Sequence, residues 1–199
     1  MIKNIVFDLG NVLLNFKPKE YLEKKGYPEQ LKETILADIF YGKEWLALDN
    51  GDITSPEAIE IIAERSSLNK DEIVRIFNLR TDLLHPLDNN VKLLEELKAE
   101  GFKLYYLSNF SDLFPEIKSR YDFFRLFDGG IISADVRVSK PDERIYRLLI
   151  DRYALVAEES LFIDDIEANT KVAAMVGMKI LTTSGSENIT PIVRKILTS

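Results

Sequence analysis

The sequence contains no cysteine and a single histidine, His85, among its 199 residues. The lack of cysteine excludes disulfide bonds, thiol nucleophiles and thiolate-bound metals. A zinc site built on several imidazoles is excluded as well, and the G-x-S-x-G motif of many serine hydrolases does not occur. Any catalysis must therefore depend on carboxylates, lysine and hydroxyl groups.

Long apolar segments and an excess of positive charge are also missing. No stretch approaches the roughly 18 apolar residues of a membrane span, and Asp8 interrupts the first apolar run too early for a signal peptide. The formal net charge of -7, from 33 acidic and 26 basic residues, disfavours nucleic acid as a partner. We therefore expect a cytoplasmic protein that binds neither membranes nor nucleic acid.

Short apolar runs alternate with helical patterns over most of the chain. Runs of this kind are typical of parallel strands that are covered on both faces. Their alternation with helices predicts an α/β fold with a doubly wound parallel sheet. The expected strands are Ile2–Phe7, Phe102–Leu107, Ile131–Ile132, Leu161–Ile163 and Met178–Leu181.

The segment of residues 16–87 has helix signals and no convincing strand. The stretches TSPE and NKDE are typical helix starts, with a capping residue followed by an acid. We therefore predict a core of residues 1–15 and 88–199, interrupted by a helical cap of residues 16–87. His85 precedes a proline in the return to the core, and we interpret it as an ordinary linker residue.

Polar side chains follow the predicted strands. In an open α/β sheet, functional groups gather at the carboxyl ends of the strands. Each motif alone is weak, but their order and shared position favour a common site. The residues are Asp8 after the first strand, Ser108 and Asn109 after the second, Lys140 after the third, and Asp164 and Asp165 after the fourth.

Three carboxylates in one crevice need a cation. Without one, repulsion between like charges would force at least one carboxylate to bind a proton. A hard divalent ion with oxygen ligands resolves this conflict, and Mg²⁺ suits such a site. One carboxylate is then free to attack phosphorus, with the cation and Lys140 sharing the phosphoryl charge.

The stretches FDLGNVLL, YYLSN, SKP and FIDDIEANTKVAAMVGM resemble, in order, the four motifs of the haloacid dehalogenase (HAD) superfamily. The resemblance covers essentially the whole predicted core. It implies a HAD-like Rossmannoid core, and the helical segment after the first motif is similar to the C1-type cap of that superfamily.

The resemblance also implies catalytic roles. Asp8 would be the nucleophile that forms an aspartyl phosphate. Ser108 and the backbone amide of Asn109 would hold the phosphoryl group, and Lys140 would balance its charge and that of Asp8.

A metal site follows from the same resemblance. Asp165 would bind Mg²⁺ directly and Asp164 through water, together with Asp8 and the backbone carbonyl of Gly10. Asn169, one helical turn after Asp165, would support this loop.

Gly10 departs from the pattern of most phosphatases in the superfamily, which carry a second aspartate there as a general acid and base. Such help is typically worth about 10²–10⁴ in rate. Three interpretations remain open: a substrate with an easy leaving group, a water or cap residue that replaces the acid, or a weak or inactive protein. A branch that acts on sugar 1-phosphates also begins FDLGNV, which favours the first.

Specificity is expected in the cap. Trp45 offers a stacking surface and Asp49 an acceptor, both suited to a sugar, although core packing for Trp45 and a turn role for Asp49 are equally open. Where the superfamily often has a glycine near position 137 or 138, this chain has Arg137 and Val138, and Arg137 could contact substrate or face solvent.

The leading hypothesis is a Mg²⁺-dependent phosphatase that acts through Asp8 on a small phosphorylated metabolite, such as a sugar 1-phosphate. The alternative is a weak or inactive HAD-like binding or regulatory protein, because Gly10 replaces the usual acid. A 2-haloacid dehalogenase is a third candidate. As in other small proteins with this type of cap, a monomer or homodimer is expected.

Overall fold

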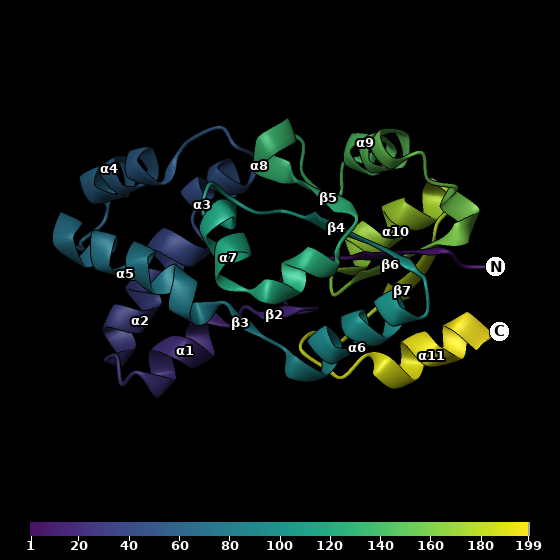
Figure 1. The fold of residues 1–199 in the computed structure, drawn as a ribbon. Coiled ribbons are helices and arrows are strands. Elements are labelled where there is room, and N and C mark those ends of the chain that lie inside the picture. Colours follow the sequence, from purple (N-terminus) through teal and green to yellow (C-terminus); the bar gives the residue numbers. More distant parts are fainter. Residues whose placement is uncertain (199) are drawn as a thin grey trace.

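A computed structural model describes residues 1–198, and its centre is a parallel five-stranded sheet with the order β5-β4-β1-β6-β7 (Figure 1). The first strand of the chain lies in the middle, paired with β4 on one side and β6 on the other. All five expected strands are present, with ends shifted by up to two residues. They are β1 (Asn4–Phe7), β4 (Lys103–Ser108), β5 (Gly129–Ile132), β6 (Ser160–Asp164) and β7 (Lys179–Thr182).

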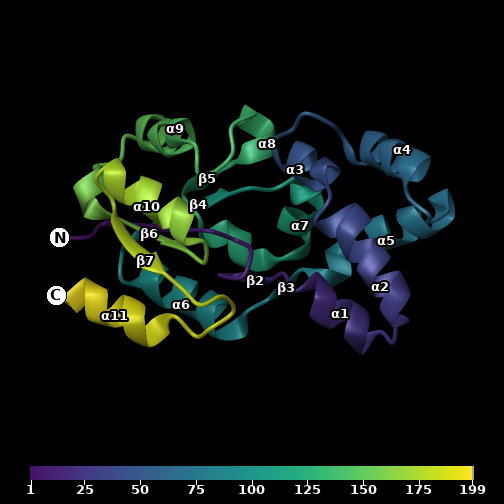
Figure 2. The same cartoon turned by 180° about the vertical axis from the view of Figure 1, so that it is seen from behind.

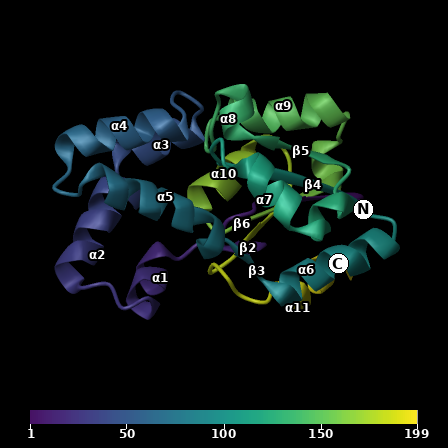
Figure 3. The same cartoon turned by 60° about the vertical axis from the view of Figure 1, so that its left-hand side comes forward.

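Helices cover both faces of the sheet, as the alternation in the sequence predicts. Ile5 and Phe7 pack with helices α6 (Asp88–Ala99) and α11 (Thr190–Thr198) on one face. Val6, between them, packs with α9 (Glu143–Tyr153) and α10 (Glu167–Met175) on the other face (Figure 3). Alternate side chains of a strand point to opposite faces, so burial on both explains the uninterrupted apolar run of β1.

The remaining core elements connect the strands. The sequence predicts no helix at α11. No helix within residues 1–198 combines the length and apolar character needed to span a bilayer. The connecting elements are α7 (Phe114–Arg120), η2 (Asp122–Leu126), α8 (Ser133–Val136) and η3 (Ala157–Glu159).

Residues 16–84 form a bundle of helices, hereafter the helical insertion, at the end of the molecule away from both termini (Figures 1 and 2). It has an apolar cluster of its own, with Leu22, Ile39, Ile62 and Ile73 fully buried. Its elements are α1 (Pro18–Lys24), α2 (Glu29–Ile35), η1 (Leu36–Phe40), α3 (Lys43–Asp49), α4 (Ser55–Arg65) and α5 (Lys70–Leu83).

Two short strands, β2 (Leu14–Asn15) and β3 (His85–Pro86), pair antiparallel where the chain leaves the core and returns to it. The sequence predicts no strand within residues 16–87, and this prediction is wrong for β3. A two-residue pairing is too short to leave an alternating pattern in the sequence. These strands lie next to the predicted boundaries at residues 15 and 88, and the division into two domains stays a prediction.

Helix starts in the insertion follow the expected signals. Asn69 caps α5: its side-chain oxygen accepts from the Glu72 amide at 2.9 Å, and the Glu72 carboxylate accepts from the Asn69 amide at 2.9 Å. Thr54 precedes α4, and its amide donates to the Glu57 carboxylate at 2.7 Å. Such caps satisfy amide groups that the first helical turn leaves free.

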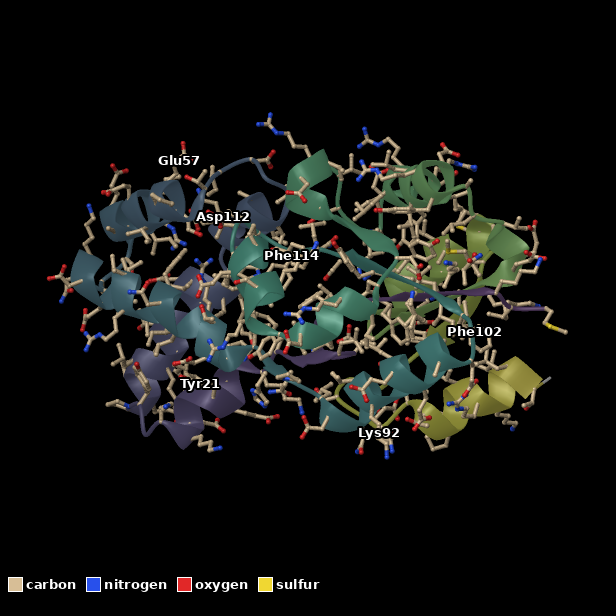
Figure 4. All side chains as sticks on the ribbon, viewed as in Figure 1. Tyr21, Glu57, Lys92, Phe102, Asp112 and Phe114 are labelled. Carbon is tan, nitrogen blue, oxygen red and sulfur yellow. The ribbon has the colours of Figure 1, made fainter. Side chains whose placement is uncertain are left out.

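Polar contacts hold the insertion against the core. The amide and hydroxyl of Ser55 donate to the two carboxylate oxygens of Asp112 at 2.7 and 2.6 Å. Asp112, labelled in Figure 4, belongs to the loop that follows β4. The backbones of the two parts also come close at Gly51, whose φ is +71° and where an added Cβ would lie 2.3 Å from the Ala134 carbonyl oxygen.

We expect the substitution Gly51→Ala to lower the free energy of unfolding more than Gly26→Ala does. Both glycines have nearly the same positive φ, +71° and +75°, which costs a residue with a Cβ about 1 kcal/mol or more. An added Cβ meets nothing within 4 Å at Gly26 but collides with Ala134 at Gly51. Urea denaturation of both variants measures the difference, and equal losses would contradict the close approach.

Candidate active site

The carboxyl ends of the central strands bring the predicted residues together. Asp8 follows β1, Ser108 ends β4 and Asp164 ends β6, so the parallel register places all three at one edge of the sheet. All three are buried, and Asp164 is fully so. The amide of Leu9 donates to the Asp8 carboxylate at 2.7 Å and fixes its orientation.

The ammonium group of Lys140 lies between two of the carboxylates. Its Nζ is 2.9 Å from Asp8 Oδ1 and 2.6 Å from Asp164 Oδ2. The lysine side chain is only 1% exposed, so these contacts are shielded from solvent. Removing one partner of such a buried ion pair is strongly destabilising, because the remaining charge is left in the interior without a partner or water.

Asn109 positions the lysine. Its side-chain amide donates to the Lys140 carbonyl at 2.9 Å, and its oxygen accepts from the Lys140 amide at 2.8 Å. The prediction for Asn109 concerned its backbone amide and missed this two-point contact. The YYLSN and SKP motifs, 31 residues apart, are therefore held together directly.

An acidic cluster surrounds this lysine. Asp8, Asp164 and Asp165 each present an oxygen within 4.8 Å of the others. Three carboxylates and one ammonium leave two negative charges when all are ionised, which matches the charge of one divalent cation. The donor set, all carboxylate oxygen, is the one that Mg²⁺ prefers.

The two acids at the end of β6 differ in the number of hydrogen bonds that hold their carboxylates. Asp164 accepts from the Asn169 side chain with both oxygens at 3.0 Å and also from the Ile166 amide at 2.8 Å. Asp165 is partly exposed and accepts from the Asn11 side chain at 3.1 Å. Asn169 thus supports Asp164, and Asn11 is a site residue that the sequence analysis did not identify.

The cluster disturbs the ionisation of its members. Burial raises the pKa of Asp8 to about 7, because the attraction of Lys140 only partly offsets desolvation and the repulsion of Asp164. Burial also raises the pKa of Asp165. For Lys140, burial acts to lower the pKa, but the carboxylates of Asp8 and Asp164 outweigh it and raise the value. The ammonium therefore stays charged at neutral pH.

A pocket of about 280 Å³ opens above the cluster, between the core and the helical insertion. Asp8, Ser108 and Lys140 lie at its charged end. Its walls are largely apolar, formed by Phe16, Trp45, Leu46, Leu84, Phe110, Leu113 and Ile166.

Trp45 and Asp49 both line this pocket. The Trp45 ring stacks on Phe16 with 5.5 Å between ring centroids, and its centroid lies 5.2 Å from that of Phe40. Trp45 therefore belongs to the packing of the insertion as well as to the pocket. Burial raises the pKa of Asp49 to about 7, and the charge of Asp8 adds to this, against the effects of Arg80, Lys140 and Trp45.

Arg80, in α5, also lines the pocket although no sequence signal marked it. Its Nε donates to the Phe77 carbonyl at 3.0 Å and one terminal nitrogen donates to Ser55 at 2.9 Å. The other terminal nitrogen is buried and has no hydrogen-bond partner among the described residues. Desolvation lowers the pKa of Arg80 to about 10, so it remains a cation at neutral pH.

Other residues considered from the sequence lie outside the pocket. His85 is exposed in β3 and its ring contacts the carbonyl of Leu83. Arg137 is exposed, and Val138 packs against an apolar cluster of the core. Gly10 does line the pocket, and an added Cβ there would meet nothing within 4 Å.

A family model described as haloacid dehalogenase-like hydrolase matches residues 2–177. The chain belongs to this hydrolase family. The match covers most of the chain, including all four motifs. The family resemblance of the sequence is thereby confirmed, whereas the narrower resemblance to sugar 1-phosphate phosphatases stays a prediction.

Relatives of this hydrolase include phosphatases from distant organisms. The sesquiterpene phosphatase AstK of Aspergillus oryzae is 28% identical over 88% of this chain and 87% of its own. The glyceraldehyde 3-phosphate phosphatase of Methanocaldococcus jannaschii is 30% identical over 89% of this chain and 83% of its own. A HAD family enzyme of Bacteroides thetaiotaomicron, solved with magnesium and inorganic phosphate, is 26% identical with a TM-score of 0.72, covering 94% and 96% of the two chains.

In the metal-free hydrolase, we expect Asp8→Asn to gain stability relative to wild type as the pH rises. The raised pKa means that the folded state disfavours ionised Asp8, so folding stability is lost between the ordinary pKa near 3.8 and the folded value of about 7. The variant escapes this loss. The unfolding free energy of Asp8→Asn minus that of wild type, measured by denaturation in EDTA, should be more than about 1 kcal/mol higher at pH 8 than at pH 5.

The matched control for this measurement is Asp151→Asn, an exposed acid in α9. Its stability should run parallel to that of wild type across the same pH range. The same parallel behaviour in Asp8→Asn would show that the buried carboxylate does not titrate in this window.

Proposed function

We propose that this hydrolase is a Mg²⁺-dependent phosphatase that transfers the phosphoryl group of a small phosphate monoester to Asp8 and then to water. One observation carries the proposal. The Asp8 carboxylate lies at the charged end of a pocket, 2.9 Å from a buried ammonium and within 4.8 Å of two further carboxylates.

The proposed roles follow from these positions. Asp8 attacks phosphorus with one carboxylate oxygen, while Lys140 holds the other oxygen and offsets the negative charge that gathers there. Ser108, buried at the end of β4, and the backbone amide of Asn109 bind the phosphoryl oxygens. Asn109 also keeps the lysine in register through its side chain.

The acidic cluster fits a divalent cation. We assign Asp8, Asp165 and the backbone carbonyl of Gly10 as its direct ligands. Asp164 has both oxygens engaged by Lys140, Asn169 and Ile166, which supports a contact through water instead. When bound, Mg²⁺ would share the charge of the phosphoryl oxygens.

The helical insertion acts as a cap in this proposal. It supplies Phe16, Trp45, Asp49 and Arg80 to the pocket, so it contacts the organic part of the substrate, while the core contacts the phosphate. Closing such a site excludes water and strengthens the electrostatic contacts within it.

The organic part of the substrate is proposed from the pocket and the relatives. A sugar phosphate agrees with the triose phosphate named for the archaeal relative and with the polar groups of Asp49 and Arg80. The apolar wall that includes Phe16, Trp45 and Leu113 favours a less polar alcohol, as the name of the fungal relative suggests. We retain the sugar phosphate as the first candidate and an isoprenoid monophosphate as the second.

Phosphate release from p-nitrophenyl phosphate tests the phosphatase. We expect wild type to release phosphate with Mg²⁺, and EDTA to abolish the release. Asp8→Asn should lower kcat/KM by at least about 10³-fold, because the amide is not a nucleophile. The exposed acid Asp151 again provides a matched control, Asp151→Asn, which should retain full activity.

Several results would contradict the phosphatase. A wild type that releases nothing above the Asp8→Asn background would favour the binding or regulatory alternative. Chloride release from a 2-haloacid without metal would favour the dehalogenase. Full activity of Asp8→Asn would exclude Asp8 as the nucleophile.

The substrate class is tested by comparing kcat/KM for glucose 1-phosphate, glucose 6-phosphate and an isoprenyl monophosphate. For a sugar 1-phosphatase, the first ester should react at least about tenfold faster than the second, because the anomeric oxygen leaves more readily. Equal rates for the two sugars would remove the leaving-group argument, and a preference for the isoprenyl ester would select the second candidate.

A further inference from the structure

We propose that Asp49 of the helical insertion is the general acid that protonates the leaving oxygen of the substrate, replacing the carboxylate that is missing at Gly10. This inference depends on the proposed phosphoryl transfer to Asp8. It assigns Asp49 a chemical role in the reaction, beyond the contact with substrate that the sequence suggests.

Few other carboxylic acids line the pocket. Three carboxylic acids line it among the described residues: Asp8, Asp49 and Asp165. Asp8 is the proposed nucleophile, and Asp165 belongs to the acidic cluster beneath the phosphate. Asp49 comes from the insertion, where the organic part of the substrate and hence the leaving oxygen would lie. The single histidine of the chain does not line the pocket.

The core fixes the position of Asp49. The hydroxyl of Ser133 donates to the Asp49 carbonyl and accepts from the Phe110 amide at 2.9 Å. Ser139, which directly precedes the site lysine, hydrogen-bonds with its hydroxyl to the Asn50 side chain. Helix α8 and the loop that carries Lys140 therefore hold the end of α3, which gives the backbone of Asp49 a defined place relative to the site.

The surroundings of Asp49 suit a group that both gives and takes a proton. Burial and the charge of Asp8 raise its pKa to about 7, whereas Arg80, Lys140 and Trp45 act in the opposite direction. General acids and bases work best when their pKa lies near the working pH. The carboxyl group can thus be protonated when substrate binds and ionised after transfer.

Asp49 gives up one proton in the first step of the proposed reaction and regains one in the second. The Asp8 oxygen forms a bond to phosphorus while the bond from phosphorus to the leaving oxygen breaks, and that electron pair goes to the leaving oxygen. Asp49 passes its proton to this oxygen, which departs as the alcohol. In the second step Asp49 accepts a proton from the attacking water, and Asp8 leaves the phosphorus as a carboxylate.

The test compares two esters of nearly equal size, phenyl phosphate and p-nitrophenyl phosphate. Phenolate is the stronger base and needs a proton as it leaves, whereas nitrophenolate does not. We expect Asp49→Asn to lower kcat/KM for phenyl phosphate about 10²-fold, and to change it less than about threefold for p-nitrophenyl phosphate. This quantity reports the transfer to Asp8, in which the leaving group takes part.

Asp52→Asn is the matched control, since Asp52 is an exposed acid three residues away. It should leave both esters unaffected. Asp49→Ser provides a second variant without a carboxyl group, should the asparagine variant fold poorly. Restoration of phenyl phosphate activity in Asp49→Asn by the added change Gly10→Asp would support the role directly, because position 10 has space for a side chain.

Two results would overturn the proposal. Equal losses of kcat/KM for the two esters would assign Asp49 to binding alone, and no loss for either would leave it without a role. The p-nitrophenyl ester separates these from failure of the phosphatase itself, because a protein that is not a phosphatase would not hydrolyse it in wild-type form either.

Discussion

The structure of the site depends on one buried ammonium group. Lys140 contacts the carboxylates that end two neighbouring strands, at 2.9 Å from Asp8 and 2.6 Å from Asp164. Without it, two acids would be buried side by side with no ion-pair partner among residues 1–198. The lysine itself comes from a loop that Asn109 holds by two hydrogen bonds. A single positive charge therefore ties together three of the four motifs.

The single charge of Lys140 does not neutralise the three carboxylates of the cluster, and the remaining negative charge favours binding of a cation. Asp8, Asp164 and Asp165 outnumber the lysine, and burial, together with the charge of Asp164, raises the pKa of Asp8 in spite of Lys140. Such a site is poised to take up a divalent cation, and the phosphate of a substrate would then find positive charge on two sides. The excess of negative charge in the cluster and its proposed function have the same electrostatic origin.

The helical insertion supplies what the core lacks. The core provides a dense group of charges, whereas the insertion adds Phe16, Trp45 and the partly buried acid Asp49 to the same pocket. Gly10 leaves the core without the usual second acid, and the proton donor that we propose comes from the insertion. Docking of the insertion, through Ser133 and the close approach of Gly51, brings a carboxyl group to the pocket.

The sequence by itself determined the five strands and the family, and it predicted the group of polar residues that the structure brings together at the ends of the strands. Apolar periodicity and strand order are local properties, and parallel strands bring their carboxyl ends to one edge whatever the details of packing. Asn11, Arg80 and the two-point contact of Asn109 were decided only by the tertiary structure. Their roles depend on which side chains of the insertion and loops reach the pocket. Asn109 and Lys140 are 31 residues apart and Asn11 and Asp165 are 154 apart, so no local pattern in the sequence predicts that these pairs meet.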